Sequence, residues 1–255
     1  MQLTRELPRR DFIAIIISLG GITLLSWLYL VKMAADMSMP ECMSAMQIPA
    51  WDAGCFWMMF LMWAVMMVGM MLPSVTPMVL IYAGIARKSA GQGMPVAPTG
   101  AFVSGYIAMR FIFSLFATIA QWGLDQAALL SPMMVSNSVG LGAALLIAAG
   151  IYQWLPIKDK CLHHCRSPVH FITTHWRPGS IGAFKMGLSH GAFCLGCCWI
   201  LMSLLFVGGV MNLFWIAVIT LFVLLEKVLP FGDVGGRVMG MLMITAGGII
   251  WFIGT

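Results

Sequence analysis

The stretch GAFKMGLSHGAFCLGCCWILMSLLFV, residues 182–207, decides the expected fold because it is a long apolar run with a single Lys and no other charged side chain. A helix of roughly 20 apolar residues crosses the hydrocarbon core of a bilayer, which is about 30 Å thick. The stretch therefore predicts a membrane-spanning helix. It also contains four side chains that suit a metal or redox site, which are His190, Cys194, Cys197 and Cys198.

The rest of the chain repeats this apolar pattern. Of its 255 residues, 61% are hydrophobic and only 9% are charged, which is not the composition of a soluble domain. We therefore predict an all-α fold, a polytopic integral membrane helical bundle that forms a single membrane domain over residues 1–255. We expect about seven transmembrane helices. They lie at about residues 12–31, 55–83, 101–122, 139–155, 182–207, 211–229 and 236–253.

The positive charges predict how this bundle is oriented. Lys and Arg gather in the cytoplasmic loops of membrane proteins. If seven helices alternate across the membrane, all of the 14 Lys and Arg residues except Lys32 and Arg110 fall on one side. We expect a cytoplasmic N-terminus, an outer loop at 33–50 and an inner loop at 156–181. This distribution also accounts for the net charge of +5 without a nucleic-acid partner.

Four ligand-type side chains share one face of the expected helix 182–207. At 100° per residue, His190, Cys194, Cys197 and Cys198 fall within an arc of roughly 100°. Polar groups at membrane depth usually mark a functional site, and thiolate and imidazole suit Cu(I), zinc and iron–sulfur centres. We favour a metal site over two alternatives, a CxxC redox pair of Cys194 and Cys197 and plain packing of small side chains.

The expected inner loop 156–181 contains a second group of ligand types. Cys161 and Cys165 are four residues apart, so they can meet on one helical turn, with His163 or His164 completing a pair of ligands. A structural disulfide is disfavoured on the cytoplasmic side of a membrane. The segment is therefore either a metal site or a basic turn whose Lys and Arg side chains contact anionic headgroups.

Methionine is the third source of soft ligands, because the chain contains 24 of them. Met66 and Met70 lie on one arc of the expected helix 55–83, and thioether sulfur binds Cu(I). Methionine also fills helix interfaces where no metal is involved. The outer loop 33–50, however, is rich in methionine where no bilayer has to be filled, and it also carries acidic residues and Cys42. We interpret this loop as an entry point for metal.

Two charged side chains, Glu226 and Arg110, lie inside expected spans. Glu226 is either a metal ligand or proton acceptor, or a member of an interfacial ion pair with Lys227 or Lys185. Arg110 lies near the middle of its span, where an unpaired cation is unfavourable. We expect Arg110 to face the bundle interior and to pair with Asp125, Glu226 or an anionic ligand.

Taken together, these motifs resemble those of a known family. The chain contains, in this order, WAVMMVGMMLP (63–73), CLHHCRSP (161–168), GLSHGAFCLGCCW (187–199), MNLFW (211–215) and Glu226-Lys227. It therefore resembles, over nearly its whole length, the bacterial family described as predicted metal-binding integral membrane proteins. The resemblance implies a multi-pass protein of the bacterial inner membrane, but it supplies no reaction.

The resemblance also implies a set of metal ligands. These map onto Cys161, His163, His164, Cys165, His190, Cys194, Cys197 and Cys198. One departure is Arg110, where the resemblance suggests an uncharged residue.

The combined observations favour a membrane protein that handles or transports a soft metal through Met and Cys/His ligands, with copper preferred over zinc or iron. Its expected partners are the lipid bilayer and the metal ion, with a metallochaperone or a partner membrane subunit as further candidates. A copper-dependent membrane oxidase or oxygenase, or a subunit of one, is the alternative, and a CxxC thiol–quinone oxidoreductase is a further one. The sequence contains no P-loop, so nucleotide-driven pumping is not expected.

Overall fold

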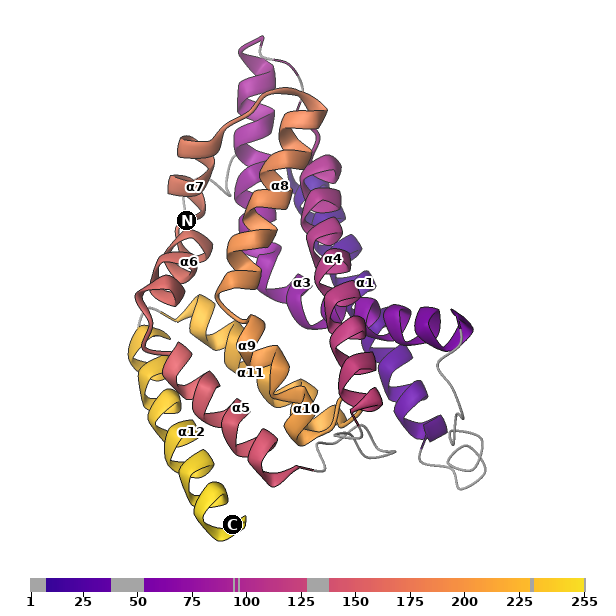
Figure 1. Cartoon of the computed structure of the whole chain (residues 1–255). Coiled ribbons are helices and arrows are strands. Elements are labelled where there is room, and N and C mark those ends of the chain that lie inside the picture. The colour runs from indigo at the N-terminus through magenta and orange to yellow at the C-terminus, as the bar shows by residue number, and fades with distance from the viewer. Residues whose placement is uncertain are drawn as a thin grey trace.

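The computed structural model describes residues 8–37, 53–93, 95, 97–127, 138–229 and 232–254. Within these ranges every regular element is a helix, which confirms the predicted all-α class. Figure 1 shows the elements, which are α1 (Arg9–Met37), α3 (Ala53–Gly91), α4 (Thr99–Gln126), α5 (Val139–Tyr152), α6 (Pro156–Arg166), α7 (Pro168–His175), α8 (Gly179–Gly196), α9 (Trp199–Ser203), α10 (Leu205–Gly208), α11 (Leu213–Val228) and α12 (Gly232–Gly254).

Several of these helices are long and apolar enough to cross a membrane. Four single helices meet this criterion of length and composition, at Arg9–Ala35, Ala53–Gly91, Thr99–Gln126 and Val234–Ile253. Two more candidates are bent pairs, α5 with α6 at 64° and α8 with α9–α10 at 63°. The described residues thus contain four to six candidate spans, and the predicted seven are not confirmed. One reason is that α11 has 16 residues, fewer than the roughly 20 that cross a bilayer.

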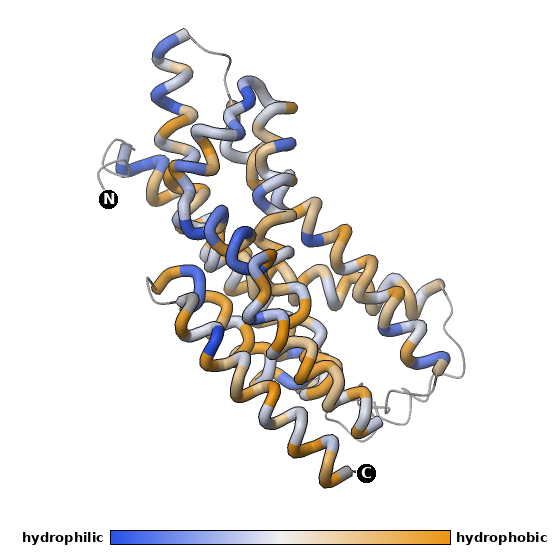
Figure 2. The backbone as a smooth tube through the Cα atoms, turned by 60° about the vertical axis from the view of Figure 1, so that its left-hand side comes forward, coloured by the Kyte–Doolittle hydropathy of each residue, from blue (hydrophilic) through white to orange (hydrophobic). Residues whose placement is uncertain are grey.

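The outer helices present apolar side chains to their surroundings. The most apolar stretches of α1 and α12 are only 17% buried inside the bundle, whereas that of α3 is 67% buried. Figure 2 shows hydrophobic residues along much of the helix that leads to the C-terminus. Large apolar faces of this kind are unusual on a protein surrounded by water. They suit lipid contact for α1 and α12, while α3 lies at the centre.

The central helix α3 changes direction near its two prolines (Figure 1). Pro73 and Pro77 lack the N–H groups that would bond to carbonyls four residues earlier, and their rings displace that turn. The carbonyl of Gly69 therefore loses its helical donor. It accepts a hydrogen bond from Trp27 Nε1 at 3.3 Å instead, which ties α1 to α3.

The expected helix 182–207 is broken rather than continuous. α8 ends at Gly196, and α9 begins at Trp199 after a short turn. Glycine is a poor helix former, and the carbonyl of Gly196 accepts a hydrogen bond from the hydroxyl of Tyr152. The two parts are bent by 63° relative to each other. The prediction of one straight helix is therefore corrected.

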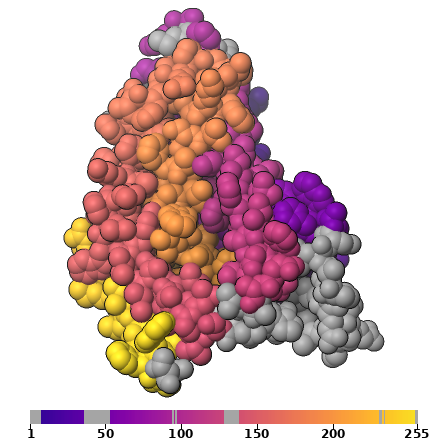
Figure 3. Space-filling view, in the orientation of Figure 1, coloured from indigo at the N-terminus to yellow at the C-terminus, as the bar shows by residue number. Residues whose placement is uncertain are grey.

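The segment 156–181, expected to be an inner loop, contains two short helices and the start of α8. Pro156 and Pro168 occupy the first turns of α6 and α7, where a missing N–H group leaves no hydrogen bond unmade. α6 packs on α8, and α7 packs on α3. Figure 3 shows α8 between these two helices on one side and α4 on the other. Cys161, His164 and His175 of the segment are thereby brought to α8.

Two glycines allow α8 to pack closely on α4. A Cβ atom added at Gly105 of α4 would overlap the carbonyl of Phe184, and one added at Gly187 of α8 would overlap the carbonyl of Phe102. Small residues of this kind permit close helix approach inside membranes. This contact holds α8, and the residues at its end, against α4.

We predict that Gly105→Ala destabilises the protein by roughly 1–3 kcal/mol, because the added methyl group forces α4 and α8 apart. Gly123→Ala is the matched control on the same helix, since nothing lies within 4 Å of a Cβ atom at that exposed position. There alanine should stabilise the helix by up to about 1 kcal/mol. Thermal unfolding of the detergent-purified variants measures both effects, and equal midpoints would contradict the close contact.

Candidate functional site

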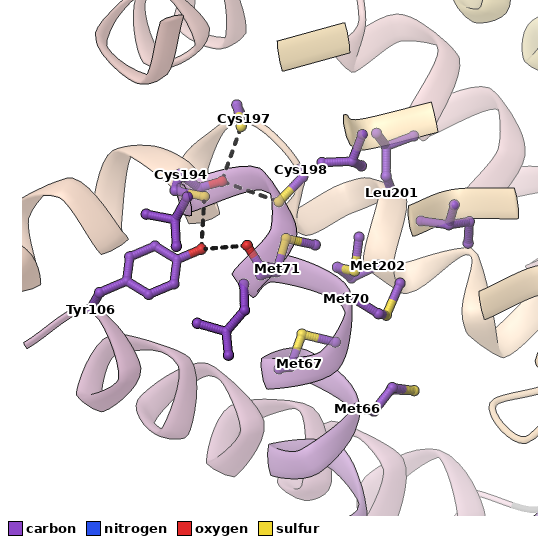
Figure 4. Close-up of a cluster of buried hydrophobic side chains, with 14 of the residues drawn as sticks. Met66, Met67, Met70, Met71, Tyr106, Cys194, Cys197, Cys198, Leu201 and Met202 are labelled. Atoms are coloured by element: carbon purple, nitrogen blue, oxygen red, sulfur yellow. Dashed lines mark hydrogen bonds between the residues drawn. The ribbon is translucent and has the colours of Figure 1, made fainter. Parts of the chain in front are cut away.

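Three buried thiols lie at the end of α8. Cys194 belongs to the last turn of the helix, and Cys197 and Cys198 form the turn that follows. The Sγ atoms of Cys197 and Cys198 donate hydrogen bonds to the carbonyl oxygen of Cys194, at 3.0 and 3.1 Å (Figure 4). The expected common helical face therefore does not extend to Cys197 and Cys198, but the turn still brings the three thiols together.

A fourth thiol reaches this group from α6. The side chain of Cys165 packs against the core that contains Cys194 and Cys197, close enough to interact with both thiols. Cys161, one helical turn earlier, lies against the same end of α8, since a Cβ atom at Gly196 would be 2.8 Å from its sulfur. Two groups of ligand types that were expected at separate places thus meet. We define the thiol cluster as Cys165, Cys194, Cys197 and Cys198.

A lysine from α11 lies beside the thiol cluster. Lys227 Nζ is 2.8 Å from Cys194 Sγ and 3.3 Å from the hydroxyl of Ser74. An ammonium group at this distance compensates negative charge on the sulfur. The sequence interpretation missed this contact, because it treated Lys227 as an interfacial partner for Glu226. The only sequence signal was a lysine at the end of an apolar helix.

A second cation reaches Cys194 through a tyrosine of α4. The hydroxyl of Tyr106 lies 3.3 Å from Cys194 Sγ and 3.4 Å from the carbonyl of Met71 (Figure 4). Arg110 Nη2 donates to that hydroxyl at 3.1 Å, and the guanidinium lies 4.7 Å from the centre of the Tyr106 ring. Arg110 is buried, but it does not pair with the expected carboxylates. Its Nε and Nη1 have no hydrogen-bond partner among the described residues.

Thioether side chains extend this sulfur-rich region along α3. Figure 4 shows Met70 and Met71 next to Cys198 and Met202, with Met66 one helical turn further along α3. These methionine side chains are fully buried. Met66 and Met70, which were predicted as ligands, therefore lie on a line of sulfur atoms that leads to the thiol cluster.

His190 lies one helical turn before Cys194 and is buried among aromatic rings. Its ring centre is 5.1 Å from that of Phe171, and the rings of Phe102 and Tyr106 also lie against it. Its Nδ1 atom is buried and has no hydrogen-bond partner in the described part of the chain. Buried polar atoms are rarely left without a partner, so His190 keeps a nitrogen available for a ligand.

Glu226 is engaged elsewhere. It forms a buried ion pair with Lys158 of α6, whose ammonium also contacts the side-chain oxygen of Gln153. The expected pairing of Glu226 with Lys227 or Lys185 is therefore wrong, because α6 folds back and brings Lys158 into the bundle. Lys158 belongs to the segment for which contact with headgroups was one alternative, and its burial in the bundle rules out that contact for this side chain.

The two predicted histidine ligands of α6 lie outside the thiol cluster. His163 is exposed, and the ring of His164 stacks on Phe193 at 4.4 Å. Most of the expected metal entry point at 33–50 lies outside the described residues. Met33, at the end of α1, is partly buried against the core.

The thiol cluster is not a ready-made coordination sphere. Across the ranges that the structure describes, no three His, Cys, Asp or Glu side chains are arranged to hold a metal ion. The thiols of Cys197 and Cys198 hydrogen-bond to the carbonyl oxygen of Cys194 instead. Their donor set of thiol and thioether sulfur fits a soft ion such as Cu(I) better than it fits a hard one.

An apolar cavity of about 220 Å³ lies beside Met202. Its lining includes the aromatic side chains of Trp63, Trp199 and Phe206.

Comparison with known proteins identifies one family. The family described as PpoB2, copper chaperone, matches residues 60–250. This range includes the thiol cluster, Lys227 and the methionines Met66 and Met70 of α3. No curated protein matches the chain, and no solved structure matches it. Because the matched range covers most of the chain, this protein belongs to the PpoB2 copper chaperone family.

Proposed function

We propose that this protein is a copper-handling membrane protein that binds Cu(I) at the thiol cluster. The observation that carries the proposal is the meeting of four thiols from α6, α8 and the turn after α8 next to the ammonium of Lys227. Thiolate sulfur is the ligand type that favours Cu(I), with zinc and iron as weaker alternatives for this donor set. Membership of a copper chaperone family supports the same metal.

Charge balance supports a thiolate-bound Cu(I) at this place. A Cu(I) ion with two thiolates carries a net charge of −1, which is unfavourable in an apolar interior without a nearby cation. Lys227 lies at hydrogen-bond distance from Cys194, and Arg110 reaches the same sulfur through Tyr106. These two cations would compensate the charge of the loaded site.

The methionines would carry copper to or from the thiol cluster. Thioether sulfur is neutral, so it binds Cu(I) more weakly than a thiolate and releases it more easily. Movement along a path needs several weak sites in a row. Met66, Met70 and Met202 offer such a row in the interior next to Cys198 (Figure 4). His190, with its unpartnered Nδ1, is a further ligand in this proposal.

The proposal also covers the location of the protein and its binding partners. The apolar faces of α1 and α12 support a place in a lipid bilayer, and we assign the protein to the bacterial inner membrane. A copper chaperone must pass its cargo to an acceptor, so a metallochaperone or a partner membrane subunit is the expected second partner. His163, His164 and Cys161 lie at the α6 side, where such a partner would approach.

A copper-dependent oxidase is the second candidate function. The observation that favours it is the apolar cavity beside Met202, lined by Trp63 and Trp199. An oxidase needs an open coordination position and room for a substrate. Oxygen consumption by the copper-loaded protein with a quinol or a phenol tests this function, and a copper carrier would consume none above the background of free copper.

We predict that Cys194→Ser and Cys197→Ser each abolish stoichiometric Cu(I) binding, because each removes a thiolate from the thiol cluster. Competition with a coloured Cu(I) chelator under anaerobic conditions measures the affinity. Cys55→Ser is the control, since Cys55 lies on the order of 20 Å along α3 from Met70. Copper binding that survives both cluster variants would refute the proposal. A reducible Cys194–Cys197 disulfide without bound copper would support the thiol–quinone oxidoreductase instead.

We predict that Lys227→Met weakens Cu(I) binding at least about tenfold, because two opposite charges about 4 Å apart interact by roughly 4 kcal/mol at an effective dielectric constant near 20. Lys227→Arg should keep most of the affinity. Lys185→Met is the matched control, because Lys185 is exposed on α8 and its loss changes the net charge by the same amount. Equal affinities for the two methionine variants would show that Lys227 does not stabilise the loaded site.

A further inference from the structure

The two short helices α6 and α7 carry four of the five histidines of the chain, which are His163, His164, His170 and His175. The helices meet at Ser167–Pro168 and pack against each other. Because proline starts α7 immediately after α6 ends, the chain turns sharply and places the histidines of both helices close together. The proposed function of the thiol cluster makes no use of His170 or His175.

Three of the four imidazole rings lie close to one another, and the fourth, that of His175, lies next to His164. His164 is central, with its ring centre 6.2 Å from that of His163, 6.4 Å from that of His170 and 6.3 Å from that of His175. His163 and His170 are 6.1 Å apart. Two imidazoles that share one tetrahedral metal ion have ring centres about 5 Å apart, given metal–nitrogen bonds of about 2.0–2.1 Å. The rings are thus not arranged as a coordination sphere in this structure, but a shift of roughly 1 Å would bring those of His163, His164 and His170 to that spacing, and His163 and His170 are exposed.

One of these rings has a defined tautomer. Nδ1 of His164 lies 2.8 Å from the carbonyl oxygen of Lys160, which only accepts hydrogen bonds, so Nδ1 carries the proton and Nε2 keeps its lone pair. Nδ1 of His175 lies 2.8 Å from the hydroxyl of Thr174 and 3.3 Å from the carbonyl oxygen of Phe171. Metal-binding histidines usually donate their other N–H group to such an acceptor.

Aromatic neighbours hold the same two rings in place. His164 stacks on Phe193 at 4.4 Å with an interplanar angle of 5°, and His175 stacks on Phe171 at 4.8 Å with an angle of 12°. Stacking of this kind limits the rotamers of the two rings. The group therefore combines two positioned ligands with two mobile ones.

We infer that His163, His164, His170 and His175 form a second metal site, one that binds a divalent ion of the borderline class through imidazole nitrogen alone. Neutral imidazole suits Cu²⁺, Zn²⁺, Ni²⁺ and Co²⁺, with Cu²⁺ bound most tightly. Lys160 lies on the same helix as His164, while the guanidinium of Arg166 is directed to the carbonyl of Leu229. The site requires binding only, with no electron transfer.

This histidine site is chemically distinct from the thiol cluster but adjacent to it. His164 precedes Cys165 in the chain and stacks on Phe193, which precedes Cys194. A partly exposed imidazole site next to buried thiols is placed to collect metal at the surface. The inference goes beyond the proposed function and does not depend on it, because no cysteine takes part.

Titration with Co²⁺ tests the site, using the full chain in detergent and without a polyhistidine tag. An imidazole-only site gives visible Co²⁺ bands without the intense near-ultraviolet band of thiolate-to-cobalt charge transfer. We expect His170→Asn and His175→Gln each to weaken Co²⁺ binding at least about tenfold. Thr173→Ala is the control, since it changes an exposed side chain on the same helix. His170 is exposed, so damage to the fold would not explain its effect.

The same variants separate this inference from the proposed function. His170→Asn should keep the Cu(I) affinity of the thiol cluster, and Cys194→Ser should keep the Co²⁺ affinity of the histidine site. Co²⁺ binding that is unchanged in both histidine variants, or that shows the thiolate band, would overturn the inference. Loss of Cu(I) binding alone would leave the histidine site standing.

Discussion

The contact between the ammonium of Lys227 and the sulfur of Cys194 is the interaction on which the rest of the site depends. It joins α11 to the end of α8 across 33 residues of sequence, at 2.8 Å. Tyr106 and Arg110 of α4 approach the same sulfur from another direction. A polar network of this kind is favourable inside an apolar bundle only if charges of opposite sign are present together. Two cations around a group of thiols therefore suit a site that holds negatively charged sulfur with a soft cation.

The bends between helices bring together parts of the site that are far apart in the sequence. The bonds from the thiols of Cys197 and Cys198 to the carbonyl of Cys194 are of a kind that a continuous helix also allows, as Ser114 and Thr118 show in α4. Cys165 meets them because α6 folds back against α8 after its own bend of 64° from α5.

Some charged side chains of this protein form contacts inside the bundle, so they cannot all be counted as markers of membrane orientation. The sequence interpretation assigned nearly all positive charges to one side of a membrane. Lys158 instead pairs with Glu226 in the interior, and Arg110 lies over the ring of Tyr106. Both side chains are buried inside the bundle, so their positions are explained by contacts within the protein. Charge counting by itself overstates the support for seven alternating spans, and the described helices give four to six.

Local properties of the sequence determined the all-α class, the apolar character of the helices and the residue types of the site. They did so because hydrophobicity and ligand chemistry belong to each residue and its near neighbours. Cys194, Cys197 and Cys198 could be identified as a group in this way, as could the buried position of Arg110. The tertiary structure alone decided that Cys165 joins them, that Lys227 faces Cys194, that Glu226 pairs with Lys158, and that four histidines gather on α6 and α7. The physical reason is that these contacts depend on where helices break and how they pack, and a break changes the position of every residue that follows it.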